Sequence, residues 1–382
     1  MAQTIKAAIV GTGFIGPAHL EALRRIPNIE VTGLVEVNQE VADAKAAELG
    51  IPNAYTFENM LKDESIDVVH ICTPNFLHFP QAKACMLAGK HVVCEKPLSM
   101  TIEEAEELVK VAKETGMINA VHFNLRYYPM VRQMRVMRQK GELGDVYSVM
   151  GSYLQDWLIH KTDYSWRLDP KQSGGSRVVA DIGSHLLDMT EYVTGLKITA
   201  VMADFSIVHP TRLKPLKAVE SFSGKALDPK DYEEYEVTSE DYATIMLRFD
   251  NGRTGSIVVS QVNAGRKNRL NIEISGSKAN YEFNAEKPNE LWIGKRDTAN
   301  SILMKDPALV DEGARSLVSF PGGHQEGFPD TSKQLFKEVY AAIRDGKQPE
   351  APTFPTFADG LRELIIGEAI VESNGKEAWV KI

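Results

Sequence analysis

The feature that most constrains the fold is a short apolar run leading directly into three regularly spaced glycines. Residues 5–10 are β-prone, glycines stand at positions 11, 13 and 16, and a helix-compatible segment follows. In a strand–turn–helix of this kind, Gly11 permits the tight turn and Gly13 lets a pyrophosphate approach the backbone. Gly16 lets the helix pack closely on the strand, and the first helical amides attract phosphate charge. A purely structural turn is the alternative.

An acidic residue stands where a dinucleotide-binding loop requires one. The next apolar run, 29–35, ends at Glu36, about twenty residues beyond the glycines. A carboxylate there accepts hydrogen bonds from the ribose hydroxyls and repels a 2′-phosphate. We therefore expect NAD as the cofactor and regard NADP as less favoured; a solvated loop acid is the alternative for Glu36.

The organisation of the chain changes after its first third. Strands are predicted at 5–10, 31–35, 67–72, 91–94 and 118–122, with helices between them. This alternation predicts a parallel, doubly wound sheet. From residue 127 on, β-rich runs predict a mostly antiparallel sheet; they span 146–155, 198–207, 242–249, 254–261, 269–276 and 279–283. Helices are expected at 129–138, 184–194, 330–344 and 358–373. The polar segment 211–240 is an excursion that either rims the substrate cleft or contributes to assembly.

Composition and charge exclude several classes of protein. The formal net charge of −9 argues against a nucleic-acid partner, which would need a clustered basic face. No apolar run is long enough to span a bilayer, and no signal peptide precedes the first strand. Cys72, Cys85 and Cys94 lack disulfide or metal-ligand spacing. We expect a cytoplasmic protein with two domains and no metal.

Two further groups of polar residues indicate chemistry. Lys96 follows the strand 91–94 and precedes a proline, which places an ammonium at the carboxyl edge of the sheet, where α/β proteins bind ligands. Asp181 and His185 lie four residues apart at the start of a helix and share one face. An acid beside an imidazole orients it and raises its basicity, as general-base catalysis requires. The alternatives are a surface ion pair for Lys96 and a helix cap with a packed histidine.

These motifs resemble the Gfo/Idh/MocA oxidoreductases over essentially the whole length of the chain. The resemblance is carried by Gly11-Thr12-Gly13-Phe14-Ile15-Gly16, Thr73-Pro74-Asn75 with His78, Glu95-Lys96-Pro97, and Asp181-x-x-x-His185. It implies an α/β protein with an N-terminal Rossmann dinucleotide-binding domain, residues 1–125. A C-terminal α+β domain, residues 126–382, would carry a large, mostly antiparallel open sheet, bind substrate and mediate homodimers or homotetramers. The last helix is expected to pack back on the first domain.

The resemblance also implies roles for individual residues. Lys96, Asp181 and His185 would be catalytic, and the Lys96–Pro97 peptide would be cis. The implied cofactor ligands are Gly11, Gly13, Phe14, Ile15, Gly16, Glu36, Thr73, Pro74, Asn75, His78, Glu95 and Lys96. A likeness to the sugar-oxidising branch, carried by residues 153–157, 165–167 and 173–176, adds Arg167 near the cofactor. The implied substrate ligands are Lys96, Asn124, Tyr127, Gln155, Asp181 and His185. For Arg167, Asn124, Tyr127 and Gln155, structural hydrogen bonds are the alternative.

The function expected from this sequence is hydride transfer between nicotinamide and a secondary alcohol of a sugar, anhydrosugar or cyclitol. His185 would take the hydroxyl proton, and Lys96 would stabilise the developing alkoxide. Two alternatives stay open: an NAD-dependent, redox-neutral glycoside hydrolase on the same fold, and a non-catalytic nucleotide-sensing regulator. The sequence leaves open the particular substrate, the carbon that is oxidised and the direction of the reaction.

Overall fold

The chain forms two compact units in a computed structural model that describes residues 4–216 and 231–382. One unit is built from the residues up to Asn124 together with Phe328–Leu364. The other contains Leu125–Gly327 and Ile365–Ile382. Among the residues described, no helix is both long and apolar enough to cross a membrane.

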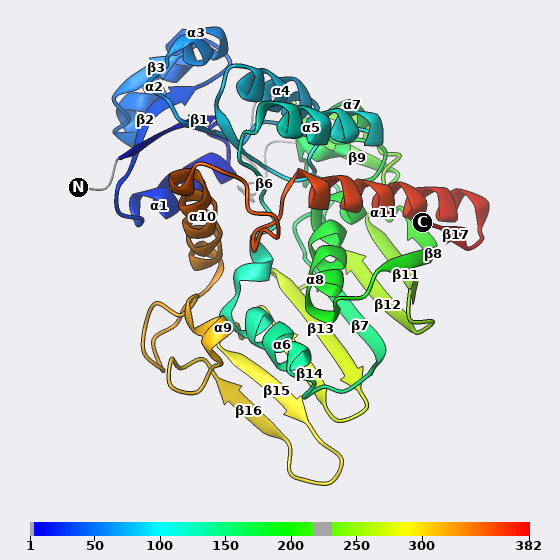
Figure 1. Ribbon diagram of the computed structural model, residues 1–382. Coiled ribbons are helices and arrows are strands. Elements are labelled where there is room, and N and C mark those ends of the chain that lie inside the picture. Colours follow the sequence, from blue (N-terminus) through cyan, green and yellow to red (C-terminus); the bar gives the residue numbers. More distant parts are fainter. Residues whose placement is uncertain (1–3, 217–230) are drawn as a thin grey trace. The chain divides into compact units, whose positions relative to one another are not determined.

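The first unit contains a six-stranded sheet in which every paired strand is parallel (Figure 1). Its strands are β1 (Ile5–Val10), β2 (Ile29–Val35), β3 (Asn53–Tyr55), β4 (Val68–Ile71), β5 (His91–Cys94) and β6 (Asn119–Val121). Their order is β3-β2-β1-β4-β5-β6. The chain therefore reverses direction across the sheet between β1 and β4, which is where a doubly wound fold binds its ligand. The predicted parallel sheet is confirmed; β3 was missed because three residues are too short to show a period.

Helices cover both faces of this sheet because alternate strand residues point to opposite sides. These helices are α1 (Ile15–Arg24), α2 (Gln39–Leu49), α3 (Phe57–Lys62), α4 (His78–Leu87), α5 (Ile102–Thr115) and α10 (Phe328–Asp345). Val10 of β1 belongs to a buried cluster that includes residues of α4 and α5, whereas Ile9 packs with residues of α1 and α2. The predicted cap of α5 is present, since the Thr101 hydroxyl accepts from the Glu104 amide.

The second unit contains a nine-stranded sheet that is mixed but mostly antiparallel. Its strands are β7 (Val146–Leu154), β8 (Ile198–Ser206), β11 (Tyr242–Phe249), β12 (Thr254–Ser260), β13 (Arg269–Gly276), β14 (Asn280–Asn284), β15 (Glu290–Gly294), β16 (Ser301–Met304) and β17 (Val380–Lys381). Their order is β16-β15-β14-β13-β7-β12-β11-β8-β17, and β7 with β12 is the parallel pair among those described. The expectation of a mostly antiparallel sheet is confirmed, although β15, β16 and β17 were not predicted.

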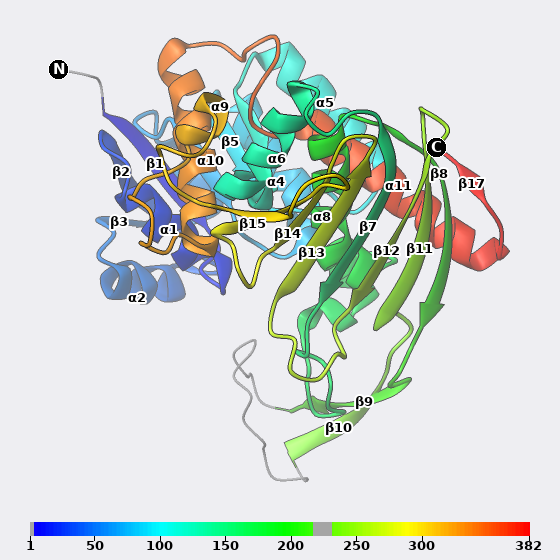
Figure 2. The same ribbon diagram turned by 90° about the horizontal axis from the view of Figure 1, so that it is seen from below.

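Helices α6 (Pro129–Gln139) and α8 (Ser184–Thr194) pack on one face of this sheet (Figures 1 and 2). Gly151 of β7 allows α8 to come close, because a Cβ there would lie 3.2 Å from the Leu186 side chain. The short helices α7 (Pro170–Ser173) and α9 (Glu312–Arg315) belong to the same unit. Helix α11 (Phe357–Lys376) begins in the first unit and ends in the second.

The polar excursion forms a two-stranded antiparallel ribbon where it is described. Strands β9 (Thr211–Pro215) and β10 (Tyr232–Glu236) pair with each other (Figure 2). In their register, Arg212 stands opposite Tyr235. Residues 217–230 of the excursion lie outside the described part of the chain. Beneath the ribbon, Leu158, Leu168 and Val237 form a small buried cluster with Tyr235 packed against it. The ribbon is therefore joined to the segment that follows β7.

Candidate active site

The three glycines after β1 meet three different geometric demands. Gly11 has a φ of +89°, and a Cβ there would lie 2.9 Å from the Cys72 carbonyl oxygen. A Cβ at Gly16 would lie 2.2 Å from the Gly11 carbonyl oxygen, so only glycine lets α1 start this close to the turn. A Cβ at Gly13 would have no atom within 4 Å. The backbone at Gly13 thus faces open space beside the N-terminus of α1, as a bound diphosphate requires.

Glu36 is held at the edge of the glycine loop by the loop itself. The Thr12 amide and hydroxyl donate to Glu36 Oε1 at 2.6 and 2.5 Å. The Val37 amide donates to Oε2 at 3.2 Å. These bonds fix the carboxylate of a partly exposed residue just beyond β2, and such a carboxylate fits a ribose diol. The predicted contacts of Glu36 with a cofactor stay a prediction.

The predicted residues after β4 and β5 are brought together by His78. Its Nδ1 lies 2.7 Å from the Pro97 carbonyl oxygen and its Nε2 lies 2.8 Å from the Thr73 carbonyl oxygen. The ring is 1 % exposed, and burial lowers its pKa. His78 therefore contacts both strand-end loops from inside the protein, and as a neutral ring it donates to one of the two carbonyl oxygens. The Lys96–Pro97 peptide is cis, as the resemblance implied.

Glu95 lies at the centre of a buried network of hydrogen-bonded side chains. His19 Nε2 and His122 Nδ1 lie 3.1 and 2.5 Å from its Oε1. Burial alone would raise the pKa of Glu95, but the facing His122 and His19 rings hold it well below its usual range. An ionised Glu95 therefore requires a proton on each of the two facing nitrogens. The Glu95 carboxylate also accepts from the Lys96 amide at 3.2 Å, so this network fixes the backbone of a predicted catalytic residue.

A proton on His19 Nε2 also determines which atoms of the residues beyond His19 carry protons in this hydrogen-bond network. Neutral His19 then accepts at Nδ1 from His70 Nδ1, 3.0 Å away. His70 Nε2 in turn accepts from the Tyr340 hydroxyl at 2.9 Å. On the other side, His122 Nε2 lies 2.9 Å from the Ser332 hydroxyl oxygen. His19 and His70 can thus make all of these hydrogen bonds as neutral rings.

His19, Glu95 and His122 are also the set of potential metal ligands that converges within the described residues. Their separations are those of hydrogen bonds. A bound zinc would stand about 2.0–2.2 Å from each ligand and spread them to near-tetrahedral angles, whereas His122 Nδ1 lies only 2.5 Å from Glu95 Oε1. The geometry fits a proton on each facing nitrogen better than a cation.

The neutral histidines predict a loss of stability in mild acid. Burial is the largest cause that lowers the pKa of His19 to about 4, and it holds that of His70 well below its ordinary value. Below about pH 6.5 the unfolded chain binds these protons and the folded protein does not, so stability falls as pH falls. The expected slope is up to about 1.4 kcal/mol per pH unit for each ring. Thermal unfolding at several pH values between 7.5 and 5 measures it.

Replacement of one ring separates this effect from general acid damage. His70→Gln should reduce the slope of melting temperature against pH by the contribution of one proton-binding group. His160→Gln, which changes an exposed histidine, should leave the slope as it is. An unchanged slope in His70→Gln would mean that His70 is already protonated in the folded protein.

In the second unit, Asp181 lies on a π-helical turn (Val179–Gly183) that leads directly into α8. Its Oδ1 is 3.2 Å from Arg167 Nε, and its Oδ2 accepts from Gln261 Nε2 at 2.8 Å. His185 is the second residue of α8, so it lies on the next turn and the same face as Asp181. The turn was not predicted, although π-helical turns are frequent at functional sites. Arg167, expected near the cofactor, is thus paired with a predicted catalytic acid.

The other predicted substrate ligands are almost completely buried. Asn124 and Gln155 are each 1 % exposed, as is Tyr127. The Asn124 amide donates to the Thr331 hydroxyl at 2.7 Å, and the Gln155 amide donates to Asn268 Oδ1 at 2.8 Å. Contacts of these three residues with a substrate stay predictions.

Comparison with known proteins shows the family of the chain. Residues 5–123 match the model of the oxidoreductase family with an NAD-binding Rossmann fold, Gfo/Idh/MocA, and residues 131–282 match the C-terminal domain model of the same family. The chain belongs to the Gfo/Idh/MocA family of oxidoreductases.

Several relatives span the whole chain. Levoglucosan dehydrogenase of Pseudarthrobacter phenanthrenivorans is 31% identical over 100% of this chain and 98% of its own length. Glucose-6-phosphate 3-dehydrogenase of Bacillus subtilis is 26% identical, with 97% of this chain and 96% of the relative covered. The structure of levoglucosan dehydrogenase in complex with NADH and levoglucosan matches with a TM-score of 0.87 and 30% identity, over 100% of this chain and 99% of that one.

Proposed function

We propose that this protein is an NAD-dependent dehydrogenase that oxidises a secondary alcohol of a sugar, anhydrosugar or cyclitol. The observation that carries the proposal is the cradle at Gly13, which faces open space beside the Thr12-bound carboxylate of Glu36. The same unit presents Lys96 after β5, and the other unit presents Asp181 and His185 on one helical face. Relatives of the same length that act on levoglucosan and on glucose 6-phosphate support this substrate class.

The chain's own residues have distinct tasks in the proposed reaction. Bound NAD⁺ supplies the hydride acceptor, so the substrate carbon loses a hydride and the hydroxyl oxygen loses a proton. His185, oriented by Asp181, takes that proton as general base. The Lys96 ammonium stabilises the negative charge that develops on the oxygen. A carbonyl product and NADH result. The acid at Glu36 favours NAD, because a 2′-phosphate beside it would be repelled.

Absorbance of reduced nicotinamide tests the proposal. Purified protein is mixed with NAD⁺ or NADP⁺ and a panel of aldoses, anhydrosugars and inositols. We expect reduced cofactor to accumulate with one of these groups, and faster with NAD⁺ than with NADP⁺. Release of a leaving group from an aryl glycoside without net NADH would instead indicate the redox-neutral hydrolase. Binding of NAD⁺ without any turnover would favour the nucleotide-sensing regulator. Assembly into homodimers or homotetramers stays a prediction.

A further inference from the structure

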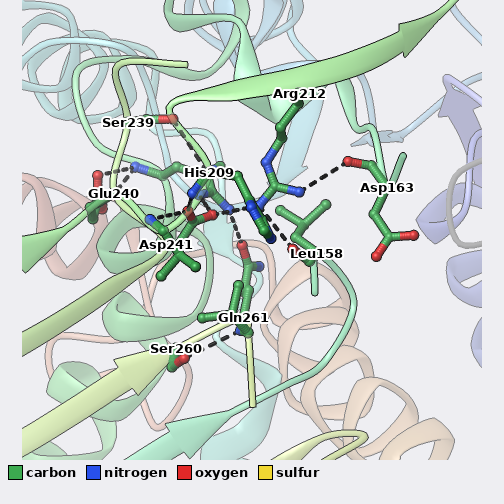
Figure 3. Close-up of polar contacts among 12 residues, drawn as sticks. Leu158, Asp163, His209, Arg212, Ser239, Glu240, Asp241, Ser260 and Gln261 are labelled. Atoms are coloured by element: carbon green, nitrogen blue, oxygen red, sulfur yellow. Dashed lines mark hydrogen bonds and ion pairs between the residues drawn. The ribbon is translucent and has the colours of Figure 1, made fainter. Parts of the chain in front are cut away.

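A fully buried charged cluster in the second unit is linked to Asp181 through the side chain of Gln261. We call it the arginine cluster; it consists of Arg177, Arg212 and Asp241. Figure 3 shows Arg212 beside Asp241. Both guanidiniums donate to Asp241 Oδ1, and the three side chains are 0% exposed. Because burial of charge is costly, such a cluster is weak evidence for added stability. The other groups to which the two arginines donate therefore indicate what the cluster does.

Arg177 determines the orientation of a buried side-chain amide. Its Nη1 donates to Gln261 Oε1 at 2.8 Å. A guanidinium has only donors, so the oxygen of Gln261 must face Arg177 and its NH₂ group must face the other way. The Asp241 carboxylate in turn fixes the guanidinium of Arg177. The backbone N–H of Gln261 also donates to the backbone carbonyl oxygen of Asp241 at 3.1 Å. The Gln261 side chain is thus fixed at both ends.

The NH₂ group of Gln261 donates to Asp181 Oδ2 at 2.8 Å. It also lies 3.3 Å from Gln155 Oε1. Arg167 Nε lies 3.2 Å from the other carboxylate oxygen of Asp181. Each oxygen of Asp181 thus faces a donor from a different part of the unit, and this limits rotation of the carboxylate.

Glu240, the residue before Asp241, fixes the backbone at the start of the helical turn that carries Asp181. The amides of Arg177 and Val179 donate to Glu240 Oε1 at 2.9 and 3.0 Å, and the Ser176 hydroxyl donates to it at 2.7 Å. Glu240 therefore holds the start of the turn while Asp241, through Arg177 and Gln261, holds the side chain of Asp181. Adjacent residues at the end of the excursion act on one turn.

We infer that Gln261, oriented by Arg177, is a positioning residue that holds the Asp181 carboxylate for its action on His185. This inference rests on the proposed function, in which Asp181 orients the general base. These hydrogen bonds predict that the neutral amide donor of Gln261 holds the Asp181 carboxylate in place without adding charge beside it. Its loss should affect proton transfer more than binding of the nucleotide.

Gln261→Glu is the sharpest test, because it keeps an acceptor for Arg177 and replaces the donor to Asp181 by a second anion. We expect turnover to fall by about 10- to 100-fold, the range found when a hydrogen-bond partner that orients a metal-ligating side chain is removed. The acid limb of the pH–rate profile should move to higher pH, since an added anion favours the protonated imidazole of His185. Affinity for NADH, measured by fluorescence, should stay within about twofold.

Gln133→Glu is a matched control in the same unit. Gln133 is a buried glutamine whose amide donates to Asp311 Oδ2 at 2.8 Å, so the change places an anion against an aspartate there too. We expect it to lower the melting temperature without moving the pH profile. Equal effects of the two variants on turnover and on the profile would overturn the inference. If Gln261→Glu does not fold, Gln261→Met removes both the donor to Asp181 and the acceptor of Arg177 without adding charge, and it should still lower turnover with little change in KM.

A measurement without turnover separates this inference from the proposed function. NMR of histidine-labelled protein follows the titration of His185, whose signal is identified by its loss in His185→Asn. Its pKa should rise in Gln261→Glu and not in Gln133→Glu, whether or not any substrate is oxidised. A wild-type protein that oxidises nothing, with the shift present, would overturn the dehydrogenase alone. A titration that does not move would overturn the role of Gln261.

Discussion

Replacement of His185 by alanine is expected to lower kcat by about 10²- to 10⁴-fold, the range for loss of a positioned general base. His185 is 9% exposed and is the second residue of α8, which follows directly after the turn that carries Asp181. Because the glycine loop and Glu36, which are proposed to bind the nucleotide, belong to the other unit, affinity for NADH should stay nearly unchanged. Steady-state kinetics with the substrate found in the panel, together with NADH fluorescence titration, measure the two quantities.

The matched control for this variant is His324→Ala, which removes an exposed histidine from the same unit. It should keep wild-type turnover. Lys96→Met gives a second check, because Lys96 and His185 are proposed to act on one transition state. Effects of groups that act as a unit are strongly non-additive, so the double variant should be much less impaired than the product of the single effects. Full turnover in His185→Ala would reject the general-base role.

Sequence patterns predicted most helices and strands because each of these elements depends on residues that are close together in the sequence. The glycine loop, the Thr101 cap and the period-two strands depend on neighbours a few residues apart. The strand ends could then be placed together, since parallel strands share a carboxyl edge. Elements of three to five residues, such as β3 and β16, escaped because so few residues show no period.

The candidate site was predictable only where its residues belong to motifs. Lys96, Asp181 and His185 stand in recognisable spacing, but Gln261 lies 84 residues from Arg177 along the chain, and Asp241 lies 64 residues from it. These contacts form only when β11, β12 and the helical turn come together in the fold. The role of Glu95 was hidden for the same reason: His19 and His122 come from distant elements. A glutamine at the end of an apolar strand gave no signal of its own.

The excursion, whose role the sequence left open between cleft and assembly, has one described function at its two ends. Arg212 in β9 donates to carbonyl oxygens of residues 158 and 160 at 2.8 and 2.9 Å, as well as to Asp241. It therefore connects the segment after β7, which leads on to Arg167, with the residue that orients Arg177. The ends of the excursion thus contribute to the structure around Asp181.

Replacement of Asp241 by asparagine is expected to cost about 3–5 kcal/mol of stability, the usual loss when one partner of a buried ion pair is removed. Burial alone would raise the pKa of Asp241, but Arg177 and Arg212 hold it below its usual range, so the residue is an anion between two buried cations. An amide leaves both guanidiniums without a counter-charge. Calorimetry of the unliganded protein should show a large fall in melting temperature.

Glu236→Gln provides the control, because it removes one negative charge from an exposed position five residues away and should shift stability by less than about 0.5 kcal/mol. Adding Arg212→Met to Asp241→Asn should recover part of the loss, since one buried cation is then removed with its partner. If Asp241→Asn were as stable as Glu236→Gln, the cluster would have to be reached by water. The orientation of Gln261, and with it that of Asp181, would then need another cause than a buried guanidinium.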